Sequence, residues 1–485
     1  MKRFISAVVF LLTTQIIFAQ VLENASYLRT LTAANINAIT LGQITASYDV
    51  DLYKITYNTP DVDGQSSIAS GLLCIPKDGT TIFPLSCYQH GTVGGREDVP
   101  SNLMGGYILP VILAGTGYVV VAPDYLGLGD SPGVHPYVHA ATEASAGVDM
   151  MRAARELDSD DSFGEFDLTD EVFITGYSQG GHAAMALHRV LETDFPSEFT
   201  VTGSAPMSGP YSISESMIDF TLGDMDYNTV AYIAWLTLGY QVAYPNTVGM
   251  ITLEEVFLPE YIPSIVQFRD EEIDLWTLND RLLNMLIANT GSTKPKDLLQ
   301  PDILNSILTD PAHPFSVALA DNDTYDWAPV APTAMYYCEG DDQVTFENAI
   351  LAESVMQSNG SSAMAVRADT DANPLNHTQC VFPAASRALA FFDGLRNLLS
   401  NTEDGLTEDN SVIYITDGNL VIDIPSDRKG QNSMIVISQT GQKLIESHLN
   451  MGINKYNMYT MNSGLYIISL RDDSGIYKTQ KVVKF

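Results

Sequence analysis

Basic residues are scarce in this sequence. Lysine and arginine together number 24, against 59 aspartates and glutamates, which gives a formal net charge of −35. Proteins that bind nucleic acid or an anionic membrane through charge need clustered lysine and arginine, because most of their contacts are to phosphate groups. The composition therefore excludes nucleic acid as an electrostatic partner. Most of the acidic side chains are expected to lie on a solvated surface.

Long apolar runs are also rare. After the first 19 residues, no window offers the roughly 20 uninterrupted apolar residues that a membrane-spanning helix requires. Residues 1–19 begin with Lys2 and Arg3, continue with an apolar stretch, and end in Ile-Phe-Ala before Gln20. This pattern is typical of a secretory signal peptide. We therefore expect an exported protein whose mature form has no transmembrane segment.

Cysteine is scarce as well, with four residues in the chain. In an exported protein this number indicates up to two disulfide bonds, and three pairings are open. Cys74 and Cys87 flank a polar loop between two strand-like runs, which suggests a bridge across a hairpin. Cys338 and Cys380 lie near two candidate catalytic residues described below, so a bridge between them would join two loops of the site. The alternative is four free, buried thiols.

Runs typical of strands alternate with runs typical of helices between residues 20 and 400. The predicted strands are 50–57, 68–75, 85–89, 118–122, 172–175, 200–205, 333–338 and 363–368, and the predicted helices are 106–114, 140–157, 182–194, 346–357 and 383–399. Such alternation predicts an α/β fold, with a mostly parallel sheet covered by helices on both faces.

One long segment, residues 211–329, interrupts the alternation. A connection of this length with its own apolar periodicity predicts an inserted helical subdomain, which would cap the site if it lies above the strand ends. Its apolar stripe of Tyr232, Trp235, Leu236 and Tyr240 is expected to form the core of the cap. The alternative is that part of the stripe lines an acyl-binding pocket or covers one as a movable lid.

The composition changes near residue 411. From there to the end, the chain holds eight lysines and arginines against six aspartates and glutamates, so nearly all of the negative excess precedes it. Short strand-like runs follow at 420–424, 433–438, 465–470 and 478–483. We predict a main domain over 20–400, a linker over 401–411 and a small β-sandwich over 412–485.

The most informative stretch is Val172-Phe-Ile-Thr-Gly-Tyr-Ser-Gln-Gly-Gly181. A β-branched and aromatic run meets Gly-x-Ser-x-Gly, and a helical segment follows, so the pattern predicts a strand, a sharp turn and a helix. Ser178 would lie at the tip of the turn, with its hydroxyl at a helix N-terminus where an oxyanion is stabilised. This context predicts that Ser178 is a nucleophile.

A serine nucleophile needs a base within hydrogen-bond reach and an acid that orients the base. In sheets with such a turn, the order along the chain is serine, acid, histidine. His377 follows the last predicted strand of the sheet and is interpreted as the base, since His448 lies in the distinct tail. Asp341, in a turn after the strand 333–338, is interpreted as the acid, with Asp342 as the alternative.

Acyl transfer also needs two backbone N–H donors that face the developing oxyanion. Gln179, directly after the nucleophile, is expected to supply one, and Thr92, in a loop after an earlier strand, the other. His135 and His139 have no Cys, Asp or Glu cluster near them in sequence that would complete a metal shell. We therefore predict neither a metal nor a cofactor.

Four motifs together resemble the secreted lipase and esterase branch of the α/β-hydrolase superfamily: Gln89-His-Gly-Thr92, Ala122-Pro-Asp-Tyr-Leu-Gly-Leu-Gly129, Gly176-Tyr-Ser-Gln-Gly-Gly181, and Gly340-Asp341 with His377. The resemblance covers residues 66–399. It implies a carboxylic ester hydrolase that acts through a Ser-His-Asp triad and an acyl-enzyme, without metal or cofactor, beneath a helical cap. The alternatives are a serine peptidase of the same fold and a catalytically inactive, surface-anchored binding protein.

The tail resembles the C-terminal sorting domain of type IX secretion cargo, through Gly441-Gln-Lys443, Ser463-Gly-Leu-Tyr-Ile-Ile468 and Lys481-Val-Val-Lys-Phe485. This resemblance implies that secretion machinery is a partner and that the protein crosses a bacterial outer membrane. The exported protein would then be released or attached to the outer cell surface. The alternative is a carbohydrate-binding or spacer module, which the absence of tryptophan from the tail disfavours.

Overall fold

The structure is a computed structural model of the chain. It describes residues 20–40, 44–77, 82–160, 162–370, 372–400, 411–416, 419–425, 432–438, 443–458, 461, 464–472 and 475–484. The expected signal peptide and residues 401–410 of the expected linker lie outside the described residues. Within the described ranges, no helix has both the length and the apolar composition of a bilayer span.

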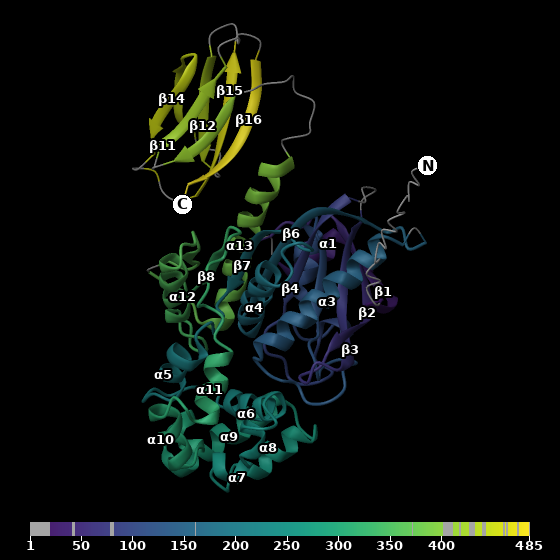
Figure 1. The fold of residues 1–485 in the computed structure, drawn as a ribbon, viewed down its shortest axis with the longest axis vertical. Helices are drawn as coiled ribbons and strands as arrows, with labels where there is room; N and C mark the ends of the chain where they lie inside the picture. Colours follow the sequence, from purple (N-terminus) through teal and green to yellow (C-terminus); the bar gives the residue numbers. More distant parts are fainter. Residues whose placement is uncertain are drawn as a thin grey trace, which may run out of the picture.

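A nine-stranded sheet forms the centre of the molecule (Figure 1), in the order β1-β2-β3-β5-β4-β6-β7-β8-β9. Its strands are β1 (Leu22–Leu31), β2 (Asp49–Pro60), β3 (Ser66–Lys77), β4 (Ile82–Gln89), β5 (Val119–Pro123), β6 (Asp167–Tyr177), β7 (Val201–Met207), β8 (Ala334–Tyr337) and β9 (Met364–Arg367). The pairs from β1 through β3 to β5 are antiparallel, and the remaining pairs are parallel. The prediction of a mostly parallel sheet is confirmed.

Helices cover both faces of the sheet. Successive residues of β5 alternate between two core clusters, because side chains alternate across a strand. Val120 belongs to the cluster that includes α1 (Ala33–Ile39), α2 (Ile108–Gly115) and α13 (His377–Ser400). Val121 belongs to the cluster that includes α3 (Ala140–Asp158) and α4 (Gln179–Thr193). A smaller cluster packs α12 (Glu347–Ser358) against Met185 of α4.

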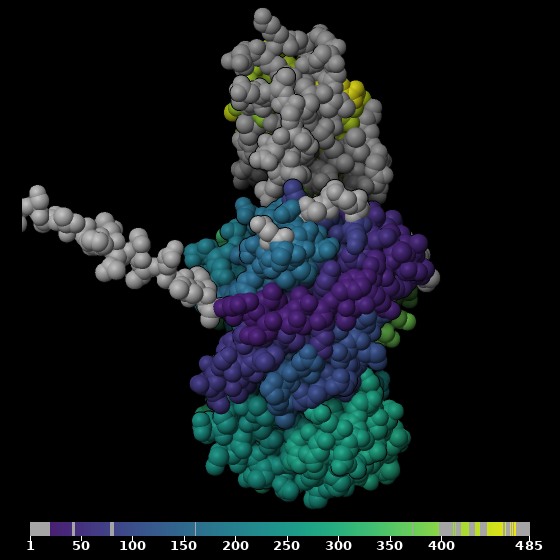
Figure 2. Space-filling view, turned by 90° about the vertical axis from the view of Figure 1, so that its right-hand side faces the viewer, coloured from purple at the N-terminus to yellow at the C-terminus, as the bar shows by residue number. Residues whose placement is uncertain are grey.

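The chain between β7 and β8 is helical and is called the cap segment here. It contains η2 (Ile213–Met217), α5 (Ile218–Thr221), α6 (Ala231–Ala243), η3 (Val248–Met250), α7 (Leu253–Val256), α8 (Ile262–Arg269), α9 (Leu275–Thr290), η4 (Pro295–Leu298), α10 (Pro301–Thr309) and α11 (Pro314–Asp321). Figure 1 shows these helices together at one end of the sheet, and in Figure 2 their teal and green surface forms one end of the molecule.

The cap segment has a core of its own. Trp235 and Tyr240 are buried there together with the apolar faces of α8 and α9. Tyr232 and Leu236, on the same helix, are only partly buried and line a cavity. The predicted apolar stripe of α6 thus contributes both to the core of the cap and to the wall of the cavity. Two of its residues are buried in the core, and two face the cavity.

The C-terminal part is made of antiparallel strands. They are β10 (Val412–Thr416), β11 (Asn419–Ile424), β12 (Asn432–Ser438), β13 (Lys443–Leu449), β14 (Gly452–Asn457), β15 (Gly464–Asp472) and β16 (Gly475–Lys484). They form one sheet in the order β10-β11-β14 and another in the order β13-β12-β15-β16. One apolar cluster joins the two sheets through residues such as Leu420, Ile422, Val436 and Ile468. This is the small β-structure that the sequence predicts.

Two expectations from the sequence are wrong. Cys74 and Cys87 do not form a bridge but are free and buried. Strand β5 lies between β3 and β4, so two strand spacings, about 10 Å, separate the two cysteines, and a disulfide needs Cα atoms within about 7 Å. Helix α13 begins at His377 rather than at Pro383, which lies inside it.

Candidate active site

Ser178 occupies the sharp turn between β6 and α4. Its backbone has φ 63° and ψ −125°, a left-handed conformation that costs energy for any residue other than glycine. The N–H of Ser178 donates to the carbonyl oxygen of Met207 at 3.0 Å, which ties the strained turn to β7. Ser178 as a whole is 8% exposed. Such strain is typical of a functional position.

Two glycines make room for this turn. A Cβ atom on Gly176 would collide with the carbonyl oxygen of Gly180, and one on Gly180 would collide with that of Gln89. Helix α4 therefore begins directly against the ends of β4 and β6. The Gly-x-Ser-x-Gly spacing is required because only residues without side chains allow this approach.

A buried carboxylate orients the imidazole of His377. Nδ1 of His377 lies 2.7 Å from Oδ2 and 2.9 Å from Oδ1 of Asp341. Oδ1 of Asp341 also accepts from the backbone N–H groups of Gln343 at 3.0 Å and Val344 at 2.9 Å. Because the carboxylate accepts from Nδ1–H, the opposite nitrogen, Nε2, is left as the basic position of the ring.

Asp342, the alternative acid, makes a different contact. Its Oδ1 accepts from the backbone N–H of His377 at 3.2 Å. The ring of His377 therefore contacts Asp341, while its main chain contacts Asp342. The two adjacent carboxylates thus fix the first residue of α13 at two separate atoms.

Tyr177 links the serine turn to the histidine. Its hydroxyl donates to the carbonyl oxygen of His377 at 2.6 Å, and the two rings lie 5.0 Å apart. Burial, followed by the nearby charge of Asp341, raises the pKa of Tyr177 well above its ordinary value, so the hydroxyl keeps its proton. The described residues contain no hydrogen bond between the Ser178 hydroxyl and His377. Sequence reasoning did not find the role of Tyr177.

The loop that carries Thr92 lies beside the serine. A Cβ atom on Gly91 would lie 3.4 Å from Cβ of Ser178, so the backbones are in near contact. The Thr92 hydroxyl shares a hydrogen bond of 2.7 Å with the hydroxyl of Tyr137. Among the described residues, the backbone N–H groups of Thr92 and Gln179 donate to no acceptor. Two free donors are thus present close to Ser178.

A disulfide bond joins the segments that carry the acid and the base. Cys338 follows β8, and Cys380 lies in the first turn of α13, with Cα atoms 6.0 Å apart. Asp341 and His377 each lie three residues from one of these cysteines. The bond therefore holds together the turn after β8, which carries Asp341, and the start of α13, which carries His377.

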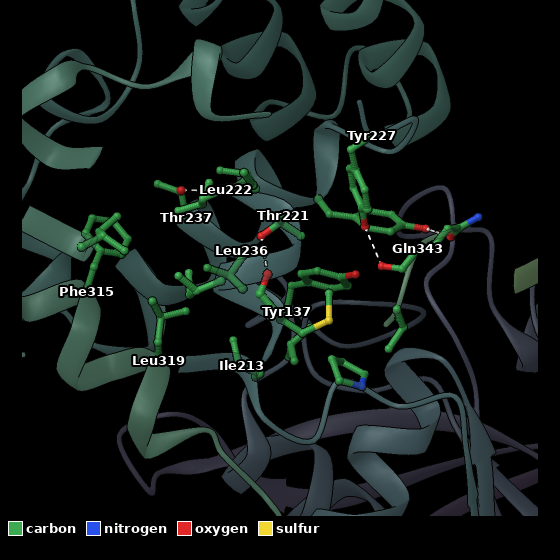
Figure 3. Close-up of a pocket in the computed structure, with 18 of the residues that line it drawn as sticks. Tyr137, Ile213, Thr221, Leu222, Tyr227, Leu236, Thr237, Phe315, Leu319 and Gln343 are labelled. Atoms are coloured by element: carbon green, nitrogen blue, oxygen red, sulfur yellow. Dashed lines mark hydrogen bonds between the residues drawn. The ribbon is translucent and has the colours of Figure 1, made fainter. Parts of the chain in front are cut away.

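An apolar cavity opens beside the serine. Ser178 and Gln179 line it at the sheet, and the cap segment supplies most of the other walls, including Ile213, Leu222, Leu236, Thr237, Phe315 and Leu319. Figure 3 shows Phe315 and Leu319 on the opposite side of this cavity from Tyr227 and Gln343. Such a space suits an apolar chain whose polar end lies at the serine.

The cap segment also contacts the turn that carries Asp341. The hydroxyl of Tyr227 donates to the carbonyl oxygen of Gln343 at 2.9 Å (Figure 3), and the hydroxyl of Tyr232 donates to the Gln343 side-chain oxygen at 2.9 Å. Cap and acid turn are therefore joined by two hydrogen bonds. In the described ranges, no group of three or more His, Cys, Asp or Glu side chains could hold a metal ion.

Comparisons with known proteins give matches among solved structures. Neither a protein-family model nor a curated protein matches the chain. The rice cell wall degrading esterase LipA from Xanthomonas oryzae is 30% identical, with a TM-score of 0.64 over 76% of this chain and 94% of LipA. A Legionella pneumophila protein classed as a hydrolase is 26% identical, with a TM-score of 0.70 over 80% of this chain and 100% of that protein.

A more distant likeness concerns the fold alone. Lipase A from Candida antarctica is 14% identical, with a TM-score of 0.55 over 74% of this chain and 78% of the lipase. All three matches cover about three quarters of this chain.

Proposed function

We propose a serine-based mechanism for this chain, which belongs to the lipase and esterase family of the α/β-hydrolases and is a carboxylic ester hydrolase. Ser178 is the nucleophile, His377 the general base and then acid, and Asp341 the residue that orients His377. The backbone N–H groups of Gln179 and Thr92 bind the oxyanion. The contact of 2.7 Å between His377 and Asp341, next to the strained serine turn, is the observation that carries this proposal.

The reaction has two steps. In the first, Oγ of Ser178 attacks the ester carbonyl while Nε2 of His377 takes its proton and then gives it to the departing alcohol. In the second, water attacks the acyl-enzyme, and His377 again transfers the proton, which releases the acid and restores the serine. Asp341 stays ionised and stabilises the imidazolium that forms in each step. The oxyanion is stabilised by the two N–H donors, each worth about 10² to 10³ in rate.

The free hydrogen-bonding positions support these roles. Nε2 of His377 is the ring nitrogen that Asp341 does not occupy. The two N–H groups assigned to the oxyanion have no protein acceptor among the described residues. An acyl carbonyl at Ser178 would give both of them a partner.

The cavity indicates the kind of ester. Its walls are mainly apolar side chains of the cap segment, and it begins at Ser178. We infer that the acyl chain of the substrate enters the cavity, while the alcohol lies outside it. Burial of each methylene is worth about 0.8 kcal/mol, so a chain that fills the cavity is favoured over acetate.

Turnover of nitrophenyl esters tests the reaction. The purified chain and its Ser178→Ala variant are compared on acetate, butyrate, octanoate and palmitate esters. The wild type is expected to cleave these esters and to prefer chains longer than acetate, while the variant shows no turnover above background. A peptide anilide and an acetylated xylan fragment serve as alternative substrates, the latter because the Xanthomonas oryzae neighbour degrades cell wall. Faster cleavage of either one would contradict the proposed substrate class.

We also propose that the C-terminal strands are a sorting domain for a second export step, so that the protein is secreted or attached to the outer surface of a bacterium. The sequence resemblance at Gly441-Gln-Lys443 and Lys481-Val-Val-Lys-Phe485 supports this assignment. The full chain and a variant without residues 411–485 are expressed in a bacterium that has type IX secretion. The full chain is expected outside the cell and the shortened one in the periplasm. Equal export of both would contradict the proposal.

A further inference from the structure

A buried carboxylate lies behind the proposed oxyanion hole. Glu143, in the first turn of α3, is 1% exposed. Its Oε1 accepts from the side-chain Nε2 of Gln179 at 2.9 Å, and its Oε2 lies 2.7 Å from Nδ1 of His182. Gln179 is the residue whose backbone N–H is assigned to the oxyanion. The acid therefore contacts the oxyanion residue through its side chain.

His182 balances this carboxylate. Its ring is fully buried, and its Nε2 lies 2.8 Å from the carbonyl oxygen of Asn322, at the end of the cap segment. A carbonyl oxygen only accepts, so Nε2 carries a hydrogen. The remaining proton lies between Nδ1 of His182 and Oε2 of Glu143, and the pair is neutral as a whole wherever that proton resides. No uncompensated negative charge therefore faces the oxyanion.

The second amide hydrogen of Gln179 is also used. Its Nε2 lies 3.0 Å from Nε2 of His135, whose Nδ1 donates to the carbonyl oxygen of Leu126 at 2.8 Å. Burial lowers the pKa of His135 to about 3, so the ring is neutral and its Nε2 accepts. Both hydrogens of the Gln179 amide thus have fixed acceptors, and its side chain has one defined orientation.

The ring of His135 is fixed in turn by the other half of the site. It stacks on Tyr125 with ring centres 5.9 Å apart, and the Tyr125 hydroxyl donates to the carbonyl oxygen of His90 at 2.9 Å. His90 lies two residues before Thr92. The same network therefore reaches the loops of both proposed oxyanion donors.

We propose that Glu143 is a positioning residue of the oxyanion hole and acts through the side chain of Gln179. This inference rests on the proposed function. The peptide between Ser178 and Gln179 is held in a strained conformation, and its N–H must point at the oxyanion rather than relax. Helix α4 fixes this peptide from one side, and the hydrogen bond from Gln179 to Glu143 fixes it from the other. Without this hydrogen bond, the backbone N–H of Gln179 is free to turn away from the oxyanion.

The prediction is a selective loss of kcat. Glu143→Ala is expected to lower kcat by about 10- to 100-fold, less than complete loss of an oxyanion donor, while KM changes less than about twofold. A trifluoromethyl ketone, which forms an oxyanion on Ser178, should bind more weakly by the same factor. Glu143→Gln keeps an acceptor for Gln179 and a donor for neutral His182, so it should retain kcat within about threefold.

A double-mutant cycle tests whether the effect passes through Gln179. Gln179→Ala keeps the backbone N–H of residue 179 but removes the side chain that hydrogen-bonds Glu143. Its loss of kcat should therefore equal that of Glu143→Ala. The double variant should be no slower than Gln179→Ala, because the interaction is already lost. If the fold-losses of kcat in the two single variants multiplied in the double variant, the two residues would act independently and the proposal would be overturned. Wild-type kcat in a folded Glu143→Ala protein would overturn it as well.

A second Glu-His pair, whose two residues both lie on α4, is the control. Oε1 of Glu192 lies 3.0 Å from Nε2 of His188, and Glu192 is 14 positions, about 21 Å along the helix, from Ser178. Glu192→Ala should lower the unfolding temperature but leave kcat and the ketone affinity unchanged. An equal fall of kcat in this variant would mean that α4 stability alone is responsible, which overturns the proposal.

Failure of the proposed function and failure of the role of Glu143 give different results. If Glu143→Ala does not fold, Gln179→Ala decides, because it leaves the Glu143-His182 pair in place, and wild-type kcat in that variant overturns the proposal. If Ser178→Ala retains ester turnover, the proposed function itself fails. If Ser178→Ala is inactive but Gln179→Ala is fully active, only the role of Glu143 is wrong.

Discussion

Nδ1 of His377 lies 2.7 Å from Oδ2 of Asp341, although the two residues are 36 positions apart in sequence. The orientation of the carboxylate is itself fixed, because its Oδ1 accepts hydrogen bonds from two backbone N–H groups of its own turn. A carboxylate held in this way selects the ring tautomer with hydrogen on Nδ1. The proton-accepting nitrogen of His377 is then always the one that faces away from the acid.

Asp341→Asn is expected to lower kcat by about 10⁴, because an amide in this place can stabilise the wrong tautomer of His377 and does not stabilise the imidazolium. Asp342→Asn is the matched control, since Asp342 hydrogen-bonds the backbone N–H of His377 and, among the described residues, makes no hydrogen bond to its ring. Its kcat should fall less than about tenfold. Steady-state kinetics on one ester decide between the two carboxylates, and a larger loss in the Asp342 variant would reverse the assignment.

The Cys338–Cys380 bond is expected to stabilise the acid and base segments. It closes a sequence separation of 42 residues, for which chain entropy predicts about 4 kcal/mol of stabilisation. The Cys338→Ser/Cys380→Ser variant should unfold at lower denaturant concentration and should lose kcat, because the start of α13 is no longer fixed to the end of β8. Unchanged unfolding and unchanged kcat would contradict this role.

The thiols of Cys74 and Cys87 are expected to be unreactive in the folded protein. Burial raises the pKa of both thiols far above the usual value, so they stay protonated. In the native wild type, a thiol reagent should therefore find no reactive cysteine, while two thiols become reactive on unfolding without reductant. Rapid reaction of the native protein would contradict the described burial.

Leu319→Phe is expected to change the chain-length preference. Leu319 lines the cavity on the side away from Gln343 (Figure 3), so a larger ring there shortens the space for the end of a long chain. The kcat/KM for palmitate should fall by about 10-fold or more, while that for butyrate changes less than about threefold, as expected for the loss of a few buried methylenes. Equal losses on both esters would mean that the acyl chain does not reach Leu319.

Stability should fall as the pH is lowered from 8 to 5.5. Burial lowers the pKa of His135 to about 3 and that of His139 to about 4, so both rings stay neutral in the folded protein while the unfolded chain binds protons below about pH 6.5. The unfolded state therefore gains protons first, which costs the folded state about 1 kcal/mol per histidine at pH 5.5.

Buried carboxyl groups with raised pKa act in the opposite direction. Desolvation raises the pKa of Asp149 and Asp323 from the usual value, so these groups favour the folded state as the pH falls toward their own titration. The range from pH 8 to 5.5 lies above the ordinary pKa values of carboxyl groups, so the histidines dominate the change in stability there. Urea unfolding of His139→Gln should show a smaller loss of stability between pH 8 and 5.5 than the wild type. An identical slope would contradict the effect of His139.

The sequence predicted the parallel part of the sheet because its strands are continuous apolar runs. Strand β1 was missed, since most of its residues are exposed and the apolar signal is weak. The sequence predicts a helix over 383–399, yet α13 begins at His377 and contains Pro383. Local patterns therefore fail at an edge strand and at a helix with an internal proline.

Contacts between distant segments were the harder part of the site. Motif spacing predicted the serine turn, and the order of residues predicted which histidine and which acid come near it. No local pattern reports that β5 lies between β3 and β4, which excludes the Cys74–Cys87 bridge. The contact from Tyr177 to His377 spans 200 positions, and the network of Glu143 joins three segments, so neither was predictable from one sequence.

Covalent trapping tests the central claim most directly. The wild type is incubated with a fluorophosphonate and, separately, with a slow nitrophenyl ester at low pH, and the modified residue is found by peptide mass spectrometry. One adduct per chain on Ser178 is expected with each reagent, with none in Ser178→Ala and slow formation in Asp341→Asn. An adduct on a different residue, or ester turnover without any modification of Ser178, would contradict the account.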